Sequence, residues 1–249
     1  DPLESNTFYA QGGIIYTGNE DSPEQLAEDL TRAGDGLNSR EAVAILSHEG
    51  PRLVRELLVD KYQVPFTLTP ENELERTREA AHSTSRILHV NDATGRAIQQ
   101  KLVEALPKQP NIQIMTQYTA IDLLTPAHHS VNRLAIYEPL SCVGAYAYNH
   151  DTGEVVTILA KATIMASGGC AQVYKRTYSP TRITGDGYAM AYRAGAELWD
   201  MELVAFCNWT IAEPKCPQWW IPFSYGRVSG KLRNSLGEPF FEKYAKENG

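Results

Sequence analysis

The segment SNTFYAQGGI near the N-terminus combines hydrogen-bonding side chains with a glycine pair, a combination that suits ligand binding. Asn6, Thr7 and Gln11 carry amide and hydroxyl groups that can form directed hydrogen bonds. Gly12 and Gly13 have no Cβ, so their backbone can approach a flat or phosphorylated ligand closely. A glycine-rich loop that only joins two elements has a similar composition. The segment therefore indicates either a ligand-binding loop or a plain connection.

The composition is that of a globular protein and disfavours two classes of function. The chain has 249 residues, of which 43% are hydrophobic and 21% are charged. Its net charge of -7, without a dense Lys/Arg run, argues against a nucleic-acid partner. No apolar run approaches the roughly 20 residues that span a bilayer. The N-terminus lacks the basic start and apolar core of a signal peptide.

The cysteines and histidines show no spacing typical of a metal site. None of the four cysteines forms a CxxC pair, and scattered thiols fit a reducing compartment, so we expect a cytoplasmic protein. His128 and His129 follow Pro126 closely, which favours a solvated turn over a pair of metal ligands. The sequence therefore predicts no metal.

Helical periodicity dominates the first 106 residues. Residues 22–38 predict a helix that begins at Ser22 and Pro23 and stops at the following glycines. Residues 39–62 predict a helix pair, and residues 93–106 predict a strongly amphipathic helix that ends before a proline.

Strand patterns follow after residue 110. Residues 111–126 predict strand, and residues 142–160 predict a hairpin around an acidic turn that is closed by a glycine. Residues 162–169 predict a short apolar strand that runs into a glycine pair, and residues 185–198 predict a helix. Strands in the middle with helices on either side indicate an α/β nucleotide-binding layer, although a strand-GxGxxG-helix fingerprint is absent.

Four stretches occur in a recognisable order: SNTFYAQGGI, RTREAAHSTSRILHVNDATG, ATIMASGGCAQVYKRTYSP and TGDGYAMAYRAGAELWDMELVAF. This order resembles the flavoprotein family of succinate dehydrogenase, fumarate reductase and L-aspartate oxidase. The resemblance implies a partial FAD-binding, Rossmann-like α/β domain over residues 1–200 and the start of an α+β capping domain over residues 201–249. It also implies an FAD-dependent oxidoreductase.

The resemblance implies a set of FAD contacts in three of these stretches. Asp186 is one of them, and a carboxylate suits this position because it can accept hydrogen bonds from hydroxyl groups of the cofactor. The alternative for that residue, Asp186, is an ordinary helix N-cap. The implied contacts are Asn6, Thr7, Gln11, Gly12, Gly13, Gly168, Gly169 and Asp186.

Within the family, TREAAHS resembles the aspartate oxidases, where an acid stands at the position of Glu79. An acid there suits an amino-acid substrate, because it can pair with the α-ammonium group. The alternative is a surface glutamate beside Arg78. His82 is a second implied substrate contact; His89 matches a family position too, and either histidine could instead be structural.

Three features depart from the family pattern. The GxGxxG unit of the family, which binds the FAD pyrophosphate, would precede Asp1. Without that unit one edge of the sheet is unpaired, so we expect either that a partner covers this edge or that the chain binds no FAD. Cys207 occupies the place of the substrate histidine, and Arg227, the candidate catalytic arginine, is one position out of register. The proton-donating arginine of the family would lie beyond Gly249.

The resemblance implies oxidation of an amino or dicarboxylic acid, with L-aspartate to iminoaspartate as the first choice. A fumarate reductase or succinate dehydrogenase flavoprotein subunit, with a possible electron-transfer subunit as partner, is the second. A member that has lost catalysis and acts as a binding module remains the third interpretation.

Overall fold

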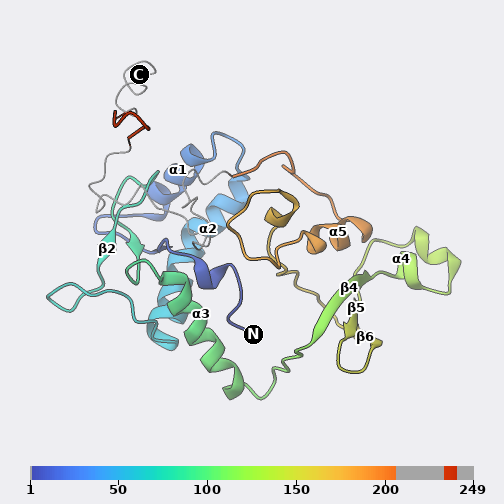
Figure 1. Ribbon diagram of the computed structural model, residues 1–249. Helices are drawn as coiled ribbons and strands as arrows, with labels where there is room; N and C mark the ends of the chain where they lie inside the picture. The colour runs from blue at the N-terminus through green and yellow to red at the C-terminus, as the bar shows by residue number, and fades with distance from the viewer. Residues whose placement is uncertain (1, 206–232, 240–249) are drawn as a thin grey trace.

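A computed structural model describes residues 2–205 and 233–239 of the chain (Figure 1). Helices α1 to α3 gather on one side of the structure, and a second sheet with α4 and α5 lies on the other (Figure 1). The helices are α1 (Pro23–Ala33), α2 (Arg40–Leu53), α3 (Thr94–Ala105), α4 (Pro126–His129) and α5 (Asp186–Arg193), and the strands are β1 (Ile14–Ile15), β2 (Arg76–Thr77), β3 (Ile87–Leu88), β4 (Tyr118–Leu124), β5 (Gly144–Asn149) and β6 (Glu154–Leu159). Shorter helical segments are η1 (Thr7–Tyr9), η2 (Val54–Lys61), η3 (Leu106–Lys108), η4 (Arg133–Tyr137) and η5 (Ala171–Val173).

The predicted start and end of α1 are confirmed. The hydroxyl of Ser22 accepts a hydrogen bond from the backbone N–H of Gln25 at 3.2 Å, and Pro23 takes the first helical position. A proline there costs no hydrogen bond, because the first N–H groups of a helix have no partner within it. Gly34 ends the helix, as the sequence predicts.

The predicted helix pair over residues 39–62 is one continuous helical run that changes its hydrogen bonding. Pro51 lies inside α2 and has no N–H to donate, and the π-helix η2 follows three residues later. Tyr62 N donates to Leu57 O, five residues back. In this run Val54 and Leu58 are buried.

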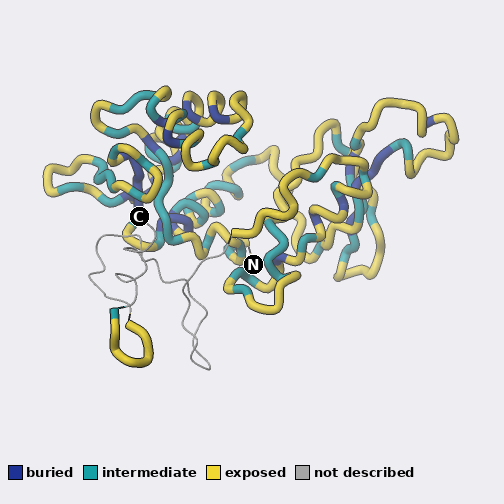
Figure 2. The backbone as a smooth tube through the Cα atoms, turned by 90° about the horizontal axis from the view of Figure 1, so that it is seen from above, coloured by how far each residue is buried: buried dark blue, intermediate teal, exposed yellow. Residues whose placement is uncertain are grey.

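The first sheet is small and antiparallel, with the order β1-β3-β2. Leu88 in its central strand pairs with Ile14 on one side and with Arg76 on the other. This strand is buried and belongs to the core, to which η2 and α3 also contribute side chains. The chain from 161 to 168 is exposed, and exposed stretches are yellow in Figure 2. The core consists of Tyr16, Val54, Leu58, Val64, Phe66, Leu88 and Ala97.

The second sheet has the order β4-β5-β6 and is also antiparallel. The predicted hairpin is confirmed: β5 and β6 pair from Gly144–Leu159 to Asn149–Glu154, and Gly153 closes the turn with a φ of 74°. α5 is attached to this sheet, because Arg193 Nε donates to Asp122 Oδ2 at 2.9 Å.

One strand prediction is wrong, and a second is confirmed only for residues 118–124. Residues 162–169 form no strand, and β4 begins only at Tyr118, so residues 111–117 are also outside any strand. A strand needs a neighbour for its N–H and C=O groups, and neither segment pairs with a strand in the described ranges. Ile164 accordingly has 91% of its surface exposed. His128 and His129 end the short helix α4 rather than a turn.

A buried arginine joins the loop before α1, α1 itself and the strand β3. Arg86 is fully buried and donates to both carboxylate oxygens of Asp21, at 2.9 and 2.7 Å, and to Asp29 Oδ2 at 2.9 Å. Asp21 also accepts from Gly18 N, and Asp29 accepts from Ser83 N and Ser83 Oγ. We call Arg86, Asp21, Asp29 and Ser83 the Arg86 cluster.

Replacing Arg86 with leucine should destabilise the protein by about 3–5 kcal/mol, because two buried carboxylates would lose their positive partner. The free energy of unfolding, measured by urea denaturation, reports this loss. Arg133→Ala is the matched control, since Arg133 is exposed and forms no ion pair within the described part of the chain. Equal losses in both variants would contradict the structural role of Arg86.

Candidate functional site

A cavity of about 1060 Å³ opens where three segments that are distant in sequence meet. Its walls come from residues 4–12, from residues 92–96 at the start of α3, and from residues 172–181. The volume reaches the upper end of the range for cofactor sites, about 300–1,000 Å³. The structure therefore places the SNTFYAQGGI segment in a cavity wall, as the ligand-binding interpretation requires.

The N-terminal wall carries three of the predicted cofactor contacts. Asn6, Gln11 and Gly12 line the cavity, whereas Thr7 and Gly13 do not. The side-chain oxygen Oε1 of Gln11 is buried and has no hydrogen-bond partner among the described residues. A buried acceptor without a partner costs free energy, so this oxygen suits a donor on a bound ligand.

Gly95, which the sequence analysis did not single out, brings α3 against this wall. Its N–H donates to Ala10 O at 3.0 Å, and a Cβ at this position would overlap with Thr7 O. Arg96 follows and places its guanidinium 4.9 Å from the ring centre of Phe8. The glycine in ATGRA is the signal that could have predicted this close contact between helix and loop.

The third wall also went unpredicted. Gln172 shapes it, because its side-chain amide donates to Ser179 O at 2.8 Å and to Pro180 O at 3.1 Å. Lys175 and Arg176 are exposed and line the cavity together with Arg96. The adjacent basic residues in YKRTYSP were the available signal.

Glu79 lies against the glycine pair. Its Oε1 accepts a hydrogen bond from Gly13 N at 2.8 Å, and the carboxylate is half-buried. A glutamate that is only a surface residue beside Arg78 would not need this hydrogen bond. The loop that carries Glu79 is held by Arg78, whose Nε donates to His82 O at 2.8 Å, and by the bonds from Ser83 to Asp29.

His82 and His89 differ in their surroundings. His82 Nδ1 is buried without a hydrogen-bond partner in the described residues, and its ring is half-buried. His89 is buried at the end of β3, where Nδ1 lies 3.5 Å from the hydroxyl of Thr67 and Nε2 lies 3.7 Å from Glu75. These contacts fit the structural alternative for His89.

Gly168, Gly169 and Asp186 do not line the cavity. A Cβ at either glycine would lie 3.5–3.6 Å from the side chain of Ile183, and the carboxylate of Asp186 accepts a hydrogen bond from the Thr184 hydroxyl at 2.6 Å. The segment that carries them leads into the third wall and into α5. Cys207 and Arg227 lie outside the described residues, as does most of the predicted second domain.

The Arg86 cluster sets the charge states around this loop. Burial alone would raise the pKa of Asp29, but hydrogen bonds from Ser83 and the charges of Arg86 and Arg32 outweigh it and lower that pKa. Burial, followed by the charge of Arg86, lowers the pKa of His82 below its ordinary value of about 6.5. His82 is therefore neutral at pH 7.

The cavity fits the features of an FAD molecule. It is large, it has a buried acceptor without a partner in Gln11, and its rim carries the basic side chains of Arg96, Lys175 and Arg176, which suit a pyrophosphate. Gly12 leaves room for a flat ring beside the backbone. Among the described residues, no group of three or more acidic, histidine or cysteine side chains could hold a metal ion.

Residues 1–246 match the model of a family described as FAD binding domain. The chain belongs to this FAD-binding family. It is 38% identical over 218 residues to L-aspartate oxidase 2-a, chloroplastic, of Nicotiana tabacum, and 39% identical over 216 residues to L-aspartate oxidase of Yersinia pestis. These matches cover 87% and 85% of this chain, and the chain spans only 32% and 39% of the two relatives.

A solved structure of a quinol fumarate reductase from E. coli has a similar fold, with a TM-score of 0.68 and 26% sequence identity. The match covers 77% of this FAD-binding chain and 31% of that chain. The resemblance drawn from the four sequence motifs, the α/β class of an FAD-binding domain and the cofactor FAD are thereby confirmed.

Gly95→Ala should push α3 away from the cavity wall of this FAD-binding protein, because the new Cβ would overlap with the backbone of Thr7 and Ala10. We expect a loss of about 1–3 kcal/mol in stability from this overpacking, together with weaker FAD binding. Urea denaturation and quenching of flavin fluorescence measure the two effects.

The matched control is Gly50→Ala, since Gly50 lies inside α2 and the nearest atom to a new Cβ is Leu46 Cδ1 at 3.6 Å. Alanine there should change stability by less than about 1 kcal/mol, because its better helix propensity and the steric conflict of its Cβ with the ring of Pro51 oppose each other. If both variants behaved alike, the contact between α3 and the loop would not matter.

The lowered pKa of Asp29 predicts a pH dependence of stability. A carboxyl whose folded pKa is below its unfolded value, about 3.9, stabilises the protein above that value, and this contribution is lost as pH falls through the folded pKa. Asp29→Asn should therefore flatten the decline in unfolding free energy below about pH 4. The control Asp35→Asn, at an exposed loop position, should keep the wild-type slope. Parallel curves for wild type and Asp29→Asn would contradict this prediction.

Proposed function

We propose that the complete polypeptide oxidises an amino dicarboxylic acid with FAD, and that L-aspartate, converted to iminoaspartate, is its substrate. One observation carries this proposal: the carboxylate of Glu79 is held at the glycine pair whose Gly12 lines the cofactor cavity. The names of the relatives, L-aspartate oxidases from a plant and a bacterium, support the same choice.

The charge of Glu79 suits a substrate with an α-ammonium group. A half-buried carboxylate attracts an ammonium more strongly than one in open water, and it repels a further carboxylate. Gly13 N fixes the position of one carboxylate oxygen and leaves the other free of any hydrogen bond within the described residues. A substrate that carries only carboxylates gains nothing from this arrangement.

We infer that neighbouring residues prepare this position for an amine. His82 is neutral at pH 7 and does not add a positive charge that would repel the ammonium. Bound FAD would supply the hydride acceptor. The residues of this chain orient the reactants: Asn6, Gln11 and Gly12 would contact the cofactor, and Arg96, Lys175 and Arg176 would hold its pyrophosphate.

On the family resemblance we also propose four further contacts with FAD. These contacts are Thr7, Gly168, Gly169 and Asp186. On the same resemblance we propose that Arg227 is catalytic, that Cys207 replaces the substrate histidine and that the domains divide at residue 200.

A second candidate function is a fumarate reductase or succinate dehydrogenase flavoprotein, which the fold similarity to quinol fumarate reductase favours. That candidate would require a partner chain that carries electrons. Within the described residues, no helix is long and apolar enough to cross a membrane. The cytoplasmic location suggested by the scattered cysteines remains a prediction.

Glu79→Gln separates the two candidates. Glutamine can still accept the hydrogen bond from Gly13 N, so the substitution removes the charge and keeps the contact. Turnover of aspartate by the complete enzyme should fall about ten- to hundredfold in kcat/KM, the worth of a charge-assisted hydrogen bond of about 1.5–3 kcal/mol. Fumarate or succinate binding should stay unchanged or improve.

Glu71→Gln is the matched control, because Glu71 is exposed and lies away from the glycine pair. It should leave both activities at the wild-type level. Equal losses for aspartate and succinate in Glu79→Gln would show that Glu79 is only structural, and turnover of succinate without any of aspartate would favour the second candidate.

A further inference from the structure

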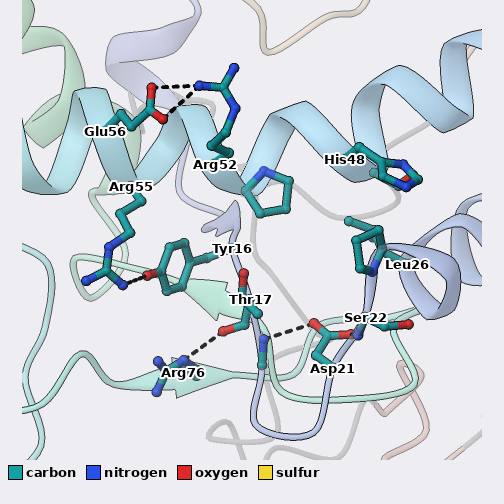
Figure 3. Close-up of a pocket in the computed structure, with 14 residues that line it drawn as sticks. Tyr16, Thr17, Asp21, Ser22, Leu26, His48, Arg52, Arg55, Glu56 and Arg76 are labelled. Carbon is teal, nitrogen blue, oxygen red and sulfur yellow. Dashed lines mark hydrogen bonds and ion pairs between the residues drawn. The ribbon is translucent and has the colours of Figure 1, made fainter.

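A second cavity, of about 440 Å³, lies between the start of α1, the α2–η2 run and the loop that follows β1 (Figure 3). It shares no lining residue with the cofactor cavity. One end carries Tyr16, Arg55 and Arg76, while Leu26 and His48 lie toward the other end (Figure 3). The proposed oxidation does not use this cavity.

Tyr16 holds two guanidinium groups at one place. Its side chain is buried, and its hydroxyl accepts a hydrogen bond from Arg55 Nη1 at 2.8 Å, which leaves the hydroxyl proton free to donate (Figure 3). The guanidinium carbon of Arg76 lies 5.7 Å from the centre of the Tyr16 ring. Arg76 Nε donates to Thr17 O at 2.8 Å, so this second guanidinium is also fixed in orientation.

The carboxylates around the cavity are occupied by other arginines. Arg52 donates to both oxygens of Glu56, at 2.7 and 2.8 Å, and also to Glu49. Hydrogen bonds to these two glutamates raise the pKa of Arg52, whose charge is therefore already paired. Asp21, at the opposite end, is bound on both oxygens by buried Arg86.

Arg55 and Arg76 have no such compensation. The nearest carboxylate to either in the described part of the chain is Asp60, whose Oδ2 lies 3.9 Å from Arg55 Nε, beyond hydrogen-bonding distance. Both side chains of that pair are more than half exposed, so water screens their attraction. In a chain of net charge -7, two oriented guanidiniums without a carboxylate leave a local positive site.

We propose that this cavity binds a small organic anion, with its carboxylate or phosphate oxygens on Arg55, Arg76 and the hydroxyl of Tyr16. The guanidinium fork matches such oxyanions in geometry and charge. The rest of the ligand would lie along the apolar surfaces of Pro23, Leu26 and Pro51. The site binds independently of the flavin reaction.

Isothermal titration calorimetry of the chain with phenyl phosphate, benzoate and inorganic phosphate tests the proposal. Phenyl phosphate or benzoate should bind more tightly than inorganic phosphate, because each adds an apolar ring. The order of the two aromatic anions shows whether the preferred group is a phosphate or a carboxylate. Arg55→Met and Arg76→Met should each weaken the binding of the tighter anion about tenfold or more, and Tyr16→Phe about two- to tenfold.

Arg133→Met is the matched control, since Arg133 is exposed, lines neither cavity and forms no ion pair within the described residues. It should change the dissociation constant less than about twofold, and Arg55→Lys should retain part of the affinity through its charge. Far-UV circular dichroism checks that each variant is folded. Undetectable binding of all three probes to the wild type, or unchanged affinity in Arg55→Met and Arg76→Met, would overturn the proposal.

Discussion

The burial of Arg86 is the constraint on which the arrangement of the described N-terminal half depends. A charge without water costs several kcal/mol, and only well-placed opposite charges and hydrogen bonds offset that cost. Asp21 and Asp29 provide them, and each is in turn tied to backbone N–H groups of the neighbouring loops. The loop before α1, the helix α1 and the loop that carries Glu79 must therefore meet at one point. Hydrophobic contacts alone would leave these polar loops freer to shift.

The same cluster acts on the candidate active site at a distance. Ser83 receives its position from Asp29, and Glu79 lies four residues before Ser83 in the same loop. Across the gap between the loops, Glu79 meets Gly13. Because a carboxylate can select an ammonium only if it is held in place, the buried ion pairs provide a physical basis for the proposed selectivity. Burial, and after it the charge of Arg86, also lowers the pKa of His82.

Local signals in the sequence predicted local structure well. The cap at Ser22, the stop at Gly34 and the turn at Gly153 depend on a few adjacent residues, and the sequence predicts all three. The strand expected at residues 162–169 failed because pairing is not a local property, and a run of apolar residues cannot show whether a neighbour exists. Likewise, the sequence identified the glycine pair but not Gly95, since the partner of Gly95 lies some 85 residues earlier in the chain. The ion pairs of Arg86 span 57 and 65 residues and could not be read from spacing.

The two cavities differ in how their arginines are used, and that difference bears on what each can bind. Around Asp21 and Asp29, the positive charges of Arg86 and Arg32 match the two carboxylates, so these groups support structure and leave no charge for a ligand. At Tyr16 the arginine charges have no matching carboxylates within the described residues: the phenol orients Arg55 without neutralising it, and a backbone carbonyl does the same for Arg76. A neutral acceptor orients a guanidinium and leaves its charge available, whereas a carboxylate orients the guanidinium and also neutralises its charge. The distinction between structural and binding arginines in this chain therefore lies in the charge of the partner and not in the number of hydrogen bonds.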